Sequence, residues 1–370
     1  MKLRTAVLVI FAFAVSVSCQ NRRRPVSAPL VREILQDKSS REYQLISASS
    51  KLNPQGEIVV IGSERAVTIL SEKMAVIDVR DNVDGSFGSD GLPDFAGETI
   101  TCIIDTTGRP EELMYVDDVS KEMIESGKYF LNGFINALDT LYHETPFDLE
   151  GIGRRTPAKM IISADPLLTD LIRYDVDTLF SALGSKVHLL APVDELSGAI
   201  LNSRSGRDVV AAVMHDPMFE NSDIFVHRFM DNASMAGSYG SSVSSFPTPK
   251  DADNLFTAFI DEYAAAGYSR PINVIAVADF GVDFEAFKND CASSLSILSE
   301  DSAKYSKYLA KDFSLVSSLE IIIAKCYDTL REDNIFTHII ANPQIVTYYC
   351  HPDPQDRFVS FLVPASYVQN

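Results

Sequence analysis

Polar residues recur where the apolar segments of this chain end, and their side chains could do chemistry there. In chain order they are Ser63, Asp78, Asp81, Asp105, Asp165, His215, Asp216 and Asp279. Carboxylates gathered at one edge of a sheet could bind a metal ion, hold an ammonium group or share a proton as an acid–base pair. We therefore treat these residues as candidates for a ligand-binding site. For each aspartate the alternative is structural, because Asp after a strand caps the helix or turn that follows.

The segment from Asp81 to Gly85 invites comparison with a calcium loop. Aligning it on Asp84 and Gly85 puts Arg80 at the first ligand position, which excludes an EF-hand. The span is otherwise a glycine-rich surface loop, whose length suits a rim or a lid. A looser calcium site stays open, with ligands from Asp81, Asp84, Asp90 and Asp94.

The sequence lacks several common catalytic and metal-binding motifs. The chain has no GxSxG, GxxxxGK[ST] or GxGxxG pattern at a strand end. The pairs His215-Asp216 and His351 with Asp353 lack the spacing of metal-binding histidines and are interpreted as turns. No cofactor or metal site is assigned.

The cysteines of the body show no redox or zinc motif, since no CxxC is present. Cys102 stands inside an apolar run and is interpreted as a buried free thiol. Three disulfide pairings are possible among Cys102, Cys291, Cys326 and Cys350.

The N-terminus has the pattern of an export signal. Lys2 and Arg4 precede an apolar run at 6–15, which is shorter than the roughly 20 residues of a membrane-spanning helix. The run ends in Ser16-Val-Ser-Cys19, which resembles the lipobox of bacterial lipoproteins, in the relaxed form common in the Bacteroidetes. This resemblance implies a signal peptide at 1–18, acylation of Cys19 and attachment to a lipid bilayer. The alternative is an ordinary cleaved signal with an incidental cysteine.

Residues after Cys19 bear on the final location. Gln20 is not the Asp of the best-known inner-membrane retention signal, and the stretch to Arg24 is basic rather than acidic. We expect the protein on the periplasmic face of the outer membrane.

The composition indicates an acidic body large enough for two lobes. The formal net charge is −19, and loss of Lys2 and Arg4 with the signal makes it −21. Such a charge repels nucleic acid and anionic membrane surfaces, so a nucleic-acid partner is set aside. About 350 remaining residues with 46% hydrophobic content can bury a sizeable core, divided between two lobes.

The hydrophobic pattern predicts a lipidated tether and two series of strands and helices. The tether covers 19–56, with a short helix near 31–36. The first lobe, 57–155, is predicted to contain strands at 57–63, 74–79, 99–104 and 114–116 and a helix at 121–142. The second lobe, 156–370, is predicted to contain helices at 167–183 and 252–266, a helical segment at 283–332, a Ser/Gly loop at 234–249, and strands at 159–163, 187–190, 208–214, 224–229, 272–277, 335–340 and 358–363.

Alternating strands and helices predict an α/β fold with mainly parallel sheets and flanking helices. The layout resembles, in architecture, the periplasmic binding proteins of the sugar and nucleoside type. That resemblance implies a cleft between two lobes, where the carboxyl ends of parallel strands bind a ligand.

The leading hypothesis is an envelope lipoprotein that binds a small polar ligand. One alternative is a hydrolase or isomerase that uses strand-end carboxylates or a cysteine. Another is an assembly or scaffold lipoprotein, whose mark would be an exposed apolar patch.

Overall fold

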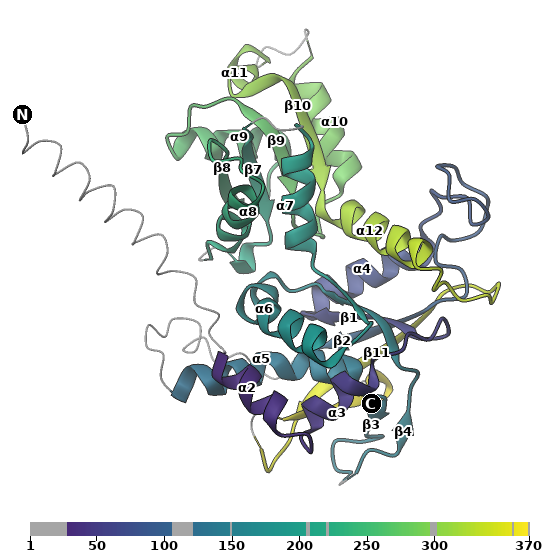
Figure 1. The fold of residues 1–370 in the computed structure, drawn as a ribbon. Helices are drawn as coiled ribbons and strands as arrows, with labels where there is room; N and C mark the ends of the chain where they lie inside the picture. The colour runs from purple at the N-terminus through teal and green to yellow at the C-terminus, as the bar shows by residue number, and fades with distance from the viewer. Residues whose placement is uncertain are drawn as a thin grey trace, which may run out of the picture.

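The computed structural model describes residues 28–105, 121–148, 150–204, 208–219, 222–296, 302–356 and 359–368. Two β-sheets with helices on both faces form two lobes, one above the other in Figure 1. The predicted α/β fold with two mainly parallel, helix-flanked lobes is confirmed. No helix in the described part of the chain combines the length and apolar character that a bilayer span requires.

The larger sheet has six strands in the order β12-β11-β2-β1-β5-β6. All neighbours are parallel except β11 and β12, which are antiparallel. We call this part the six-stranded lobe. Its strands are β1 (Glu57–Gly62), β2 (Thr99–Ile104), β5 (Ala158–Ser163), β6 (His188–Leu190), β11 (Gln344–Pro352) and β12 (Ser360–Pro364).

Strand β1 shows why this sheet is covered on both faces. Val59 and Ile61 pack into one hydrophobic cluster, while Ile58 and Val60 pack into another on the opposite face. Alternate side chains of a strand point to opposite faces, so a continuous apolar run requires helices on both sides. The first face is covered by α2 (Ala28–Gln36), α3 (Arg41–Ala48), α5 (Lys121–Leu138) and α6 (Pro166–Leu183), and the second by α4 (Glu64–Val76) and α12 (Ser318–Glu332).

The smaller sheet has four parallel strands in the order β10-β9-β7-β8. We call this part the four-stranded lobe. Its strands are β7 (Val210–His215), β8 (Ser242–Pro247), β9 (Ile272–Val277) and β10 (Leu309–Ser317). One face carries α7 (Pro192–Asn202) and α8 (Ile224–Met235), and the other carries α9 (Leu255–Ala265) and α10 (Phe284–Ser294). The short elements of the molecule are β3 (Leu141–Tyr142), β4 (Gly153–Arg154), η2 (Pro217–Phe219), α11 (Ser302–Ser306) and α13 (Ala365–Val368).

The predicted lobe boundary after residue 155 is wrong. Strands β5 and β6 follow that point, yet both belong to the six-stranded sheet with β1 and β2. The chain enters the four-stranded lobe between Leu190 and Pro192, and it returns at Ser317, where α12 begins. Sheet membership depends on long-range pairing, which similar strand–helix units do not specify by themselves.

The predicted tether is also wrong from Ala28 onward, although the short helix predicted near 31–36 is confirmed as part of α2. Helices α2 and α3 pack Leu30, Ile34 and Ile46 into the core of the six-stranded lobe. The tether's first part, with Cys19, lies outside the described residues.

Several local predictions fail where an apolar run belongs to a helix or where a strand is polar. Residues 74–76 are the end of α4, and 224–229 are the start of α8. Both segments are predicted as strands because a short apolar run from a buried helix has the same composition as a strand. The predicted loop at 234–249 contains β8, and the predicted helical segment at 283–332 contains β10. No strand forms at 335–340, and β11 follows it instead; the strand predicted at 114–116 lies outside the described residues.

Buried ion pairs hold the amino ends of the larger sheet. Lys159 of β5 lies 2.6 Å from Glu98, measured from Nζ to Oε2, and both side chains are at most 1% exposed. The Lys159 ammonium also donates to the carbonyls of Pro54 and Ile335. Burial raises the pKa of Glu98 and lowers that of Lys159. Arg155 and Glu57 form a second buried pair at 2.8 Å. Charges at this edge are therefore structural.

Removing one partner of the Lys159–Glu98 pair should lower the free energy of unfolding much more than removing both. The variant Lys159→Met leaves a buried carboxylate without its cation, and we expect a loss of about 3–5 kcal/mol in the free energy of unfolding. The double variant Lys159→Met with Glu98→Met should lose less, because no charge remains buried. Urea unfolding measures both. Equal losses in the single and double variants would contradict this assignment.

Candidate functional site

The carboxyl ends of strands from both sheets face each other across a cleft. Ser63, Arg65 and Ala164 line it from the six-stranded lobe, and Asp216 and Asp279 line it from the four-stranded lobe. These positions lie one or two residues after β1, β5, β7 and β9, or in the first turn of the next helix. The two lobes thus bring together the carboxyl-terminal strand edges of two mainly parallel sheets, and in open α/β sheets such edges are where ligands bind.

Arg65 joins the two lobes electrostatically. Its guanidinium forms an ion pair with Asp216 through Nη1, and Nη2 lies 3.0 Å from Oδ1 of Asp279. The Arg65 side chain is 49% exposed, whereas that of Asp279 is 3% exposed. We call these three residues the interlobe ion cluster. It places one half-exposed cation between two carboxylates of the opposite lobe.

Local structure explains how Arg65 reaches across. Ser63 caps α4, with its side chain accepting a hydrogen bond from the amide of Ala66. Arg65 therefore stands in the first turn of a helix that begins at the cleft.

The four-stranded lobe holds the two carboxylates in place without help from Arg65. Asp279 accepts hydrogen bonds from the Gly281 amide and the Thr248 hydroxyl, both at 2.8 Å. Asp216 accepts one from the Met218 amide at 2.9 Å. Hydrogen-bond donors of the same lobe therefore fix the orientation of both carboxylates at the cleft.

His215 lies behind the cleft and packs against the core. It is buried, and its ring stacks on Phe225 with a centroid distance of 5.2 Å. Its Nδ1 lies 3.0 Å from the carbonyl of Asp216. The histidine supports the chain at Asp216 and is not among the residues that line the cleft.

Two other predicted residues end strands at the same edge but do not line the cleft. The Asp105 amide donates to the carbonyl of Gly62. Asp165 is buried, and its carbonyl accepts from the Thr169 amide at the start of α6. Their neighbours Ser63 and Ala164 face the cleft instead.

The structure does not bring Asp78 and Asp81 to the cleft, which corrects the prediction. They follow α4, which runs back from the cleft toward the amino ends of the strands. Asp78 accepts from the Ser89 hydroxyl and from the amides of Asp90 and Gly91, while Asp81 accepts from the amides of Val83 and Asp84. Both carboxylates organise the loop between α4 and β2.

The same hydrogen bonds account for the acidic residues of the suggested calcium site. Hydrogen bonds from the side chain and the amide of Ser86 lower the pKa of Asp84, and those from the amides of Asn82 and Leu92 lower the pKa of Asp90. Asp94 accepts from the amides of Val79 and Arg80. Over the described ranges, no three His, Cys, Asp or Glu side chains are grouped as metal ligands.

The interlobe cavity is small in this arrangement. Its volume is about 30 Å³, and apolar side chains such as Phe219 and Phe280 complete its walls. A water needs about 10–15 Å³ of such space, so the cavity holds only a few atoms. A ligand of metabolite size requires the lobes to separate.

Sequence reasoning missed Arg65, although the signal is visible. It considered residues that end strands, and Arg65 lies two residues further on, in the first turn of the next helix. From that position the long side chain of Arg65 reaches carboxylates at the facing edge of the other sheet.

The four cysteines of the body are free and buried, which agrees with the prediction for Cys102. Burial raises the pKa of Cys102, Cys291 and Cys350, the latter two to about 11 and 12. It also raises the pKa of Cys326. None of the four lines the cleft, so thiol chemistry there has no support in the described residues.

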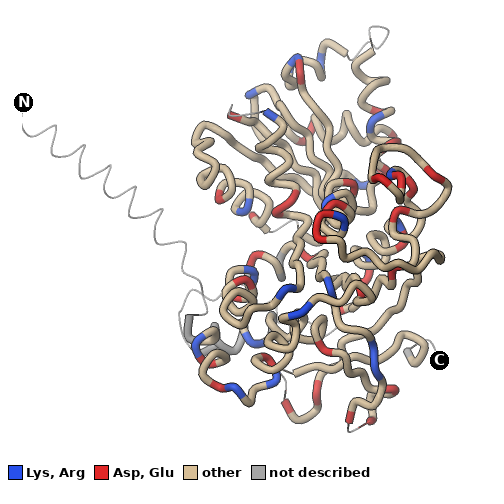
Figure 2. Tube along the Cα trace, turned by 45° about the vertical axis from the view of Figure 1, so that its right-hand side comes forward, with Lys and Arg blue, Asp and Glu red and all other residues tan. Residues whose placement is uncertain are grey.

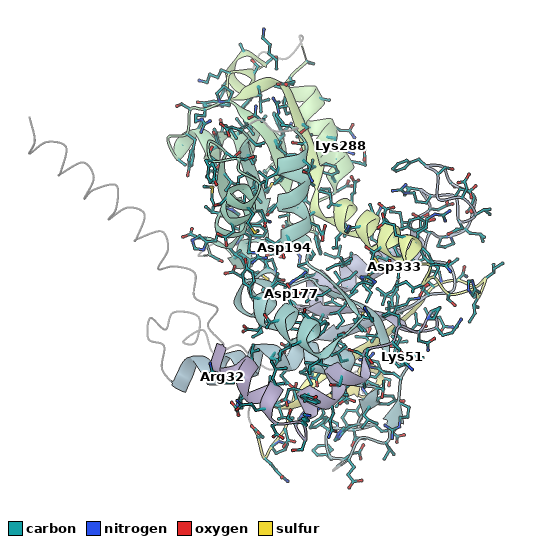
Figure 3. All side chains as sticks on the ribbon, viewed as in Figure 1. Arg32, Lys51, Asp177, Asp194, Lys288 and Asp333 are labelled. Carbon is teal, nitrogen blue, oxygen red and sulfur yellow. The ribbon has the colours of Figure 1, made fainter. Side chains whose placement is uncertain are left out.

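Acidic and basic residues are interspersed over both lobes, as Figure 2 shows. Figure 3 places Asp194, at the start of α7, where the chain has just entered the four-stranded lobe. Asp194 pairs with Arg228 of α8, within the same lobe. Arg228 also faces the six-stranded lobe, where its guanidinium lies over the ring of Tyr174 in α6. At the cleft, Arg65 pairs with two carboxylates of the opposite lobe.

Comparison with known proteins gives fold-level neighbours only. No family model matches the chain, and no curated protein is found as a relative. A glutamate racemase from Bacillus anthracis aligns with a TM-score of 0.46 and 12% identity, over 80% of this chain and 89% of that chain. A glutamate racemase from Francisella tularensis in complex with D-glutamate gives 0.45 and 12%, over 82% and 91%. An aspartate racemase homologue from Pyrococcus horikoshii gives 0.34 and 12%, over 75% and 99%. The chemistry of this chain therefore has to be argued from its own cleft.

The buried thiols should be unreactive in the folded protein. In a Cys19→Ser chain, we expect none of the four body cysteines to react with Ellman's reagent within minutes, because all four are buried and protonated at pH 7.5. In denaturant all four should react. One thiol that reacts rapidly in the native protein would reopen the cysteine alternative.

Proposed function

We propose that the protein is a lipid-anchored envelope protein that binds a small polar ligand between its two lobes. The interlobe ion cluster is the observation that supports this most, since it joins polar groups of both lobes across one cleft. Two connections lead from lobe to lobe, at 190–192 and at 317–318. Lobes joined in this way can open and close about their connections.

The energy of the ion cluster suits a reversible closure. A hydrogen bond to a charged group contributes about 1.5–3 kcal/mol net, and solvent around a half-exposed arginine lowers that contribution. A ligand that binds the open cleft can offset an energy of this size. The lobes would then open to admit the ligand and close around it.

Ligand binding predicts a co-purifying small molecule whose retention depends on Asp279. Native mass spectrometry of the chain, purified in detergent, should show an adduct of metabolite mass. The variant Asp279→Asn should lose it, because a buried carboxylate of the cleft becomes neutral. Asp312→Asn is the matched control, since Asp312 pairs with Arg204 within the four-stranded lobe. A single ligand-free mass in every preparation, with no shift in melting temperature from a panel of metabolites, would count against binding.

The anchor is proposed from the sequence around Cys19. Wild-type protein should incorporate radiolabelled palmitate in bacterial cells and sediment with membranes, whereas Cys19→Ser should do neither. The acyl chain buries its methylenes in the bilayer at about 0.8 kcal/mol each. Separating inner from outer membranes then tests the proposed outer-membrane location. Equal labelling of both chains would contradict lipidation at Cys19.

An isomerase is a second candidate, favoured by the two carboxylates at the cleft. Carboxylates can act as general acids and bases. Glutamate and aspartate, named for the structural neighbours, are the first substrates to assay. Racemisation requires proton transfer on both faces of a carbon, whereas Asp216 and Asp279 come from one lobe and both contact Arg65. Conversion of one enantiomer into the other, with uptake of deuterium from heavy water, would favour the enzyme over the binder.

The scaffold alternative has a separate observation in its favour. Val83, Phe87 and Ile340 are each more than 80% exposed. They lie on the loop after α4 and on the segment before β11, far from the strand ends that form the cleft.

A further inference from the structure

We propose that the ligand of the cleft is a cation that takes the place of the Arg65 guanidinium between Asp216 and Asp279. This inference rests on the proposed binding function and names the chemical class that the site would accept. In the protein without ligand, the Arg65 guanidinium occupies the position that the cationic group of the ligand would take. A guanidinium or a primary ammonium group on a short aliphatic stem fits this description best.

Charge compensation is the first argument. Asp279 is 3% exposed, and its carboxylate contacts the Thr248 hydroxyl, the Gly281 amide and Arg65. Within the described ranges, Arg65 is the cation that pairs with this carboxylate. Opening the cleft withdraws Arg65 and leaves a carboxylate that remains partly desolvated. An uncompensated buried charge is costly, so the ligand that replaces Arg65 must itself be positive.

Shape is the second argument. Asp216 and Asp279 each contact a different terminal nitrogen of one guanidinium, so the two carboxylates are spaced for a planar fork. Gly281 lies directly against Nη2 of Arg65, and a Cβ at this position would overlap that nitrogen. The backbone at 281 therefore leaves room for a guanidinium that any larger residue would fill.

The surroundings agree with a cation on an apolar stem. Ala66, Phe219 and Phe280 line the cleft beside the charged groups. The mature chain carries a formal net charge of −21 once Lys2 and Arg4 are removed from the −19 of the full sequence. An acidic body raises the local concentration of cationic ligands and lowers that of anions.

Chemical rescue tests whether a cation binds between Asp216 and Asp279, and it does not require the natural ligand to be known. The variant Arg65→Ala removes the side chain beyond Cβ, and N-ethylguanidinium has the shape of the missing part. We expect N-ethylguanidinium at millimolar concentration to raise the melting temperature of Arg65→Ala by roughly 2–4 °C, because it binds the native state only. The wild-type chain should shift by less than about 1 °C. Circular dichroism checks the fold, and Arg65→Ser provides a second variant if Arg65→Ala is poorly folded.

Three controls separate recognition of the cation from general effects. Arg204→Ala removes an arginine whose partner, Asp312, belongs to the same lobe, so this variant should not respond. N-ethylurea has a similar shape without the charge and should have no effect on Arg65→Ala. The double variant Arg65→Ala with Asp279→Asn should lose the response. An equal response of Arg65→Ala and Arg204→Ala, or an equal effect of N-ethylurea, would overturn the proposal.

The outcome also separates this inference from the function on which it rests. A co-purifying ligand that is neutral or anionic would leave the binding function standing and would overturn the cationic class. Rescue by N-ethylguanidinium in a protein that never carries a ligand would support a cation site between Asp216 and Asp279 and would count against the proposed ligand-binding function.

Discussion

Asp279 is a buried carboxylate at the place where two mainly parallel sheets meet, and its ion-pair partner comes from the opposite lobe. Its own lobe supplies two hydrogen-bond donors, and the opposite lobe supplies the guanidinium of Arg65. A parallel sheet collects the starts of its helices and the polar ends of its strands at one edge. Two such edges face each other in this protein, and Arg65 forms ion pairs across them.

The two edges of the larger sheet have different roles. At the amino ends of the strands, Lys159 and Glu98 are almost completely buried and lie within one lobe, where they can only stabilise the fold. At the carboxyl ends, Arg65 is half exposed and pairs with residues of the other lobe. We propose that this second group of charges is the part of the structure that changes when a ligand binds, because its arginine is half exposed to solvent and the group lies at the interlobe cavity.

Much of the architecture could be predicted from the sequence, because continuous apolar strands alternating with amphipathic helices are typical of parallel sheets. Of the eight body residues proposed for the site, Ser63, Asp216 and Asp279 line the cleft. Asp105, Asp165 and His215 end strands nearby, whereas Asp78 and Asp81 belong to a loop at the opposite edge. That error arose because the last turn of α4, at Met74, has the composition of a strand. The exchange of the chain between lobes could not be predicted, since strand order depends on contacts between distant segments.

The central proposal is that the interlobe ion cluster helps to hold the two lobes together and does so reversibly. Pulsed electron spin resonance on nitroxides at Lys51→Cys and Lys288→Cys measures it most directly, because these positions lie on opposite lobes (Figure 3) and the native body cysteines are buried. In a Cys19→Ser background, we predict a single distance between the two nitroxides at low salt. In 1 M NaCl the Debye length is about 3 Å, so the ion pairs of Arg65 are screened, and a population with a longer distance should grow. Arg65→Ala should show the longer distance at low salt as well. One unchanged distance in all three conditions would contradict the account.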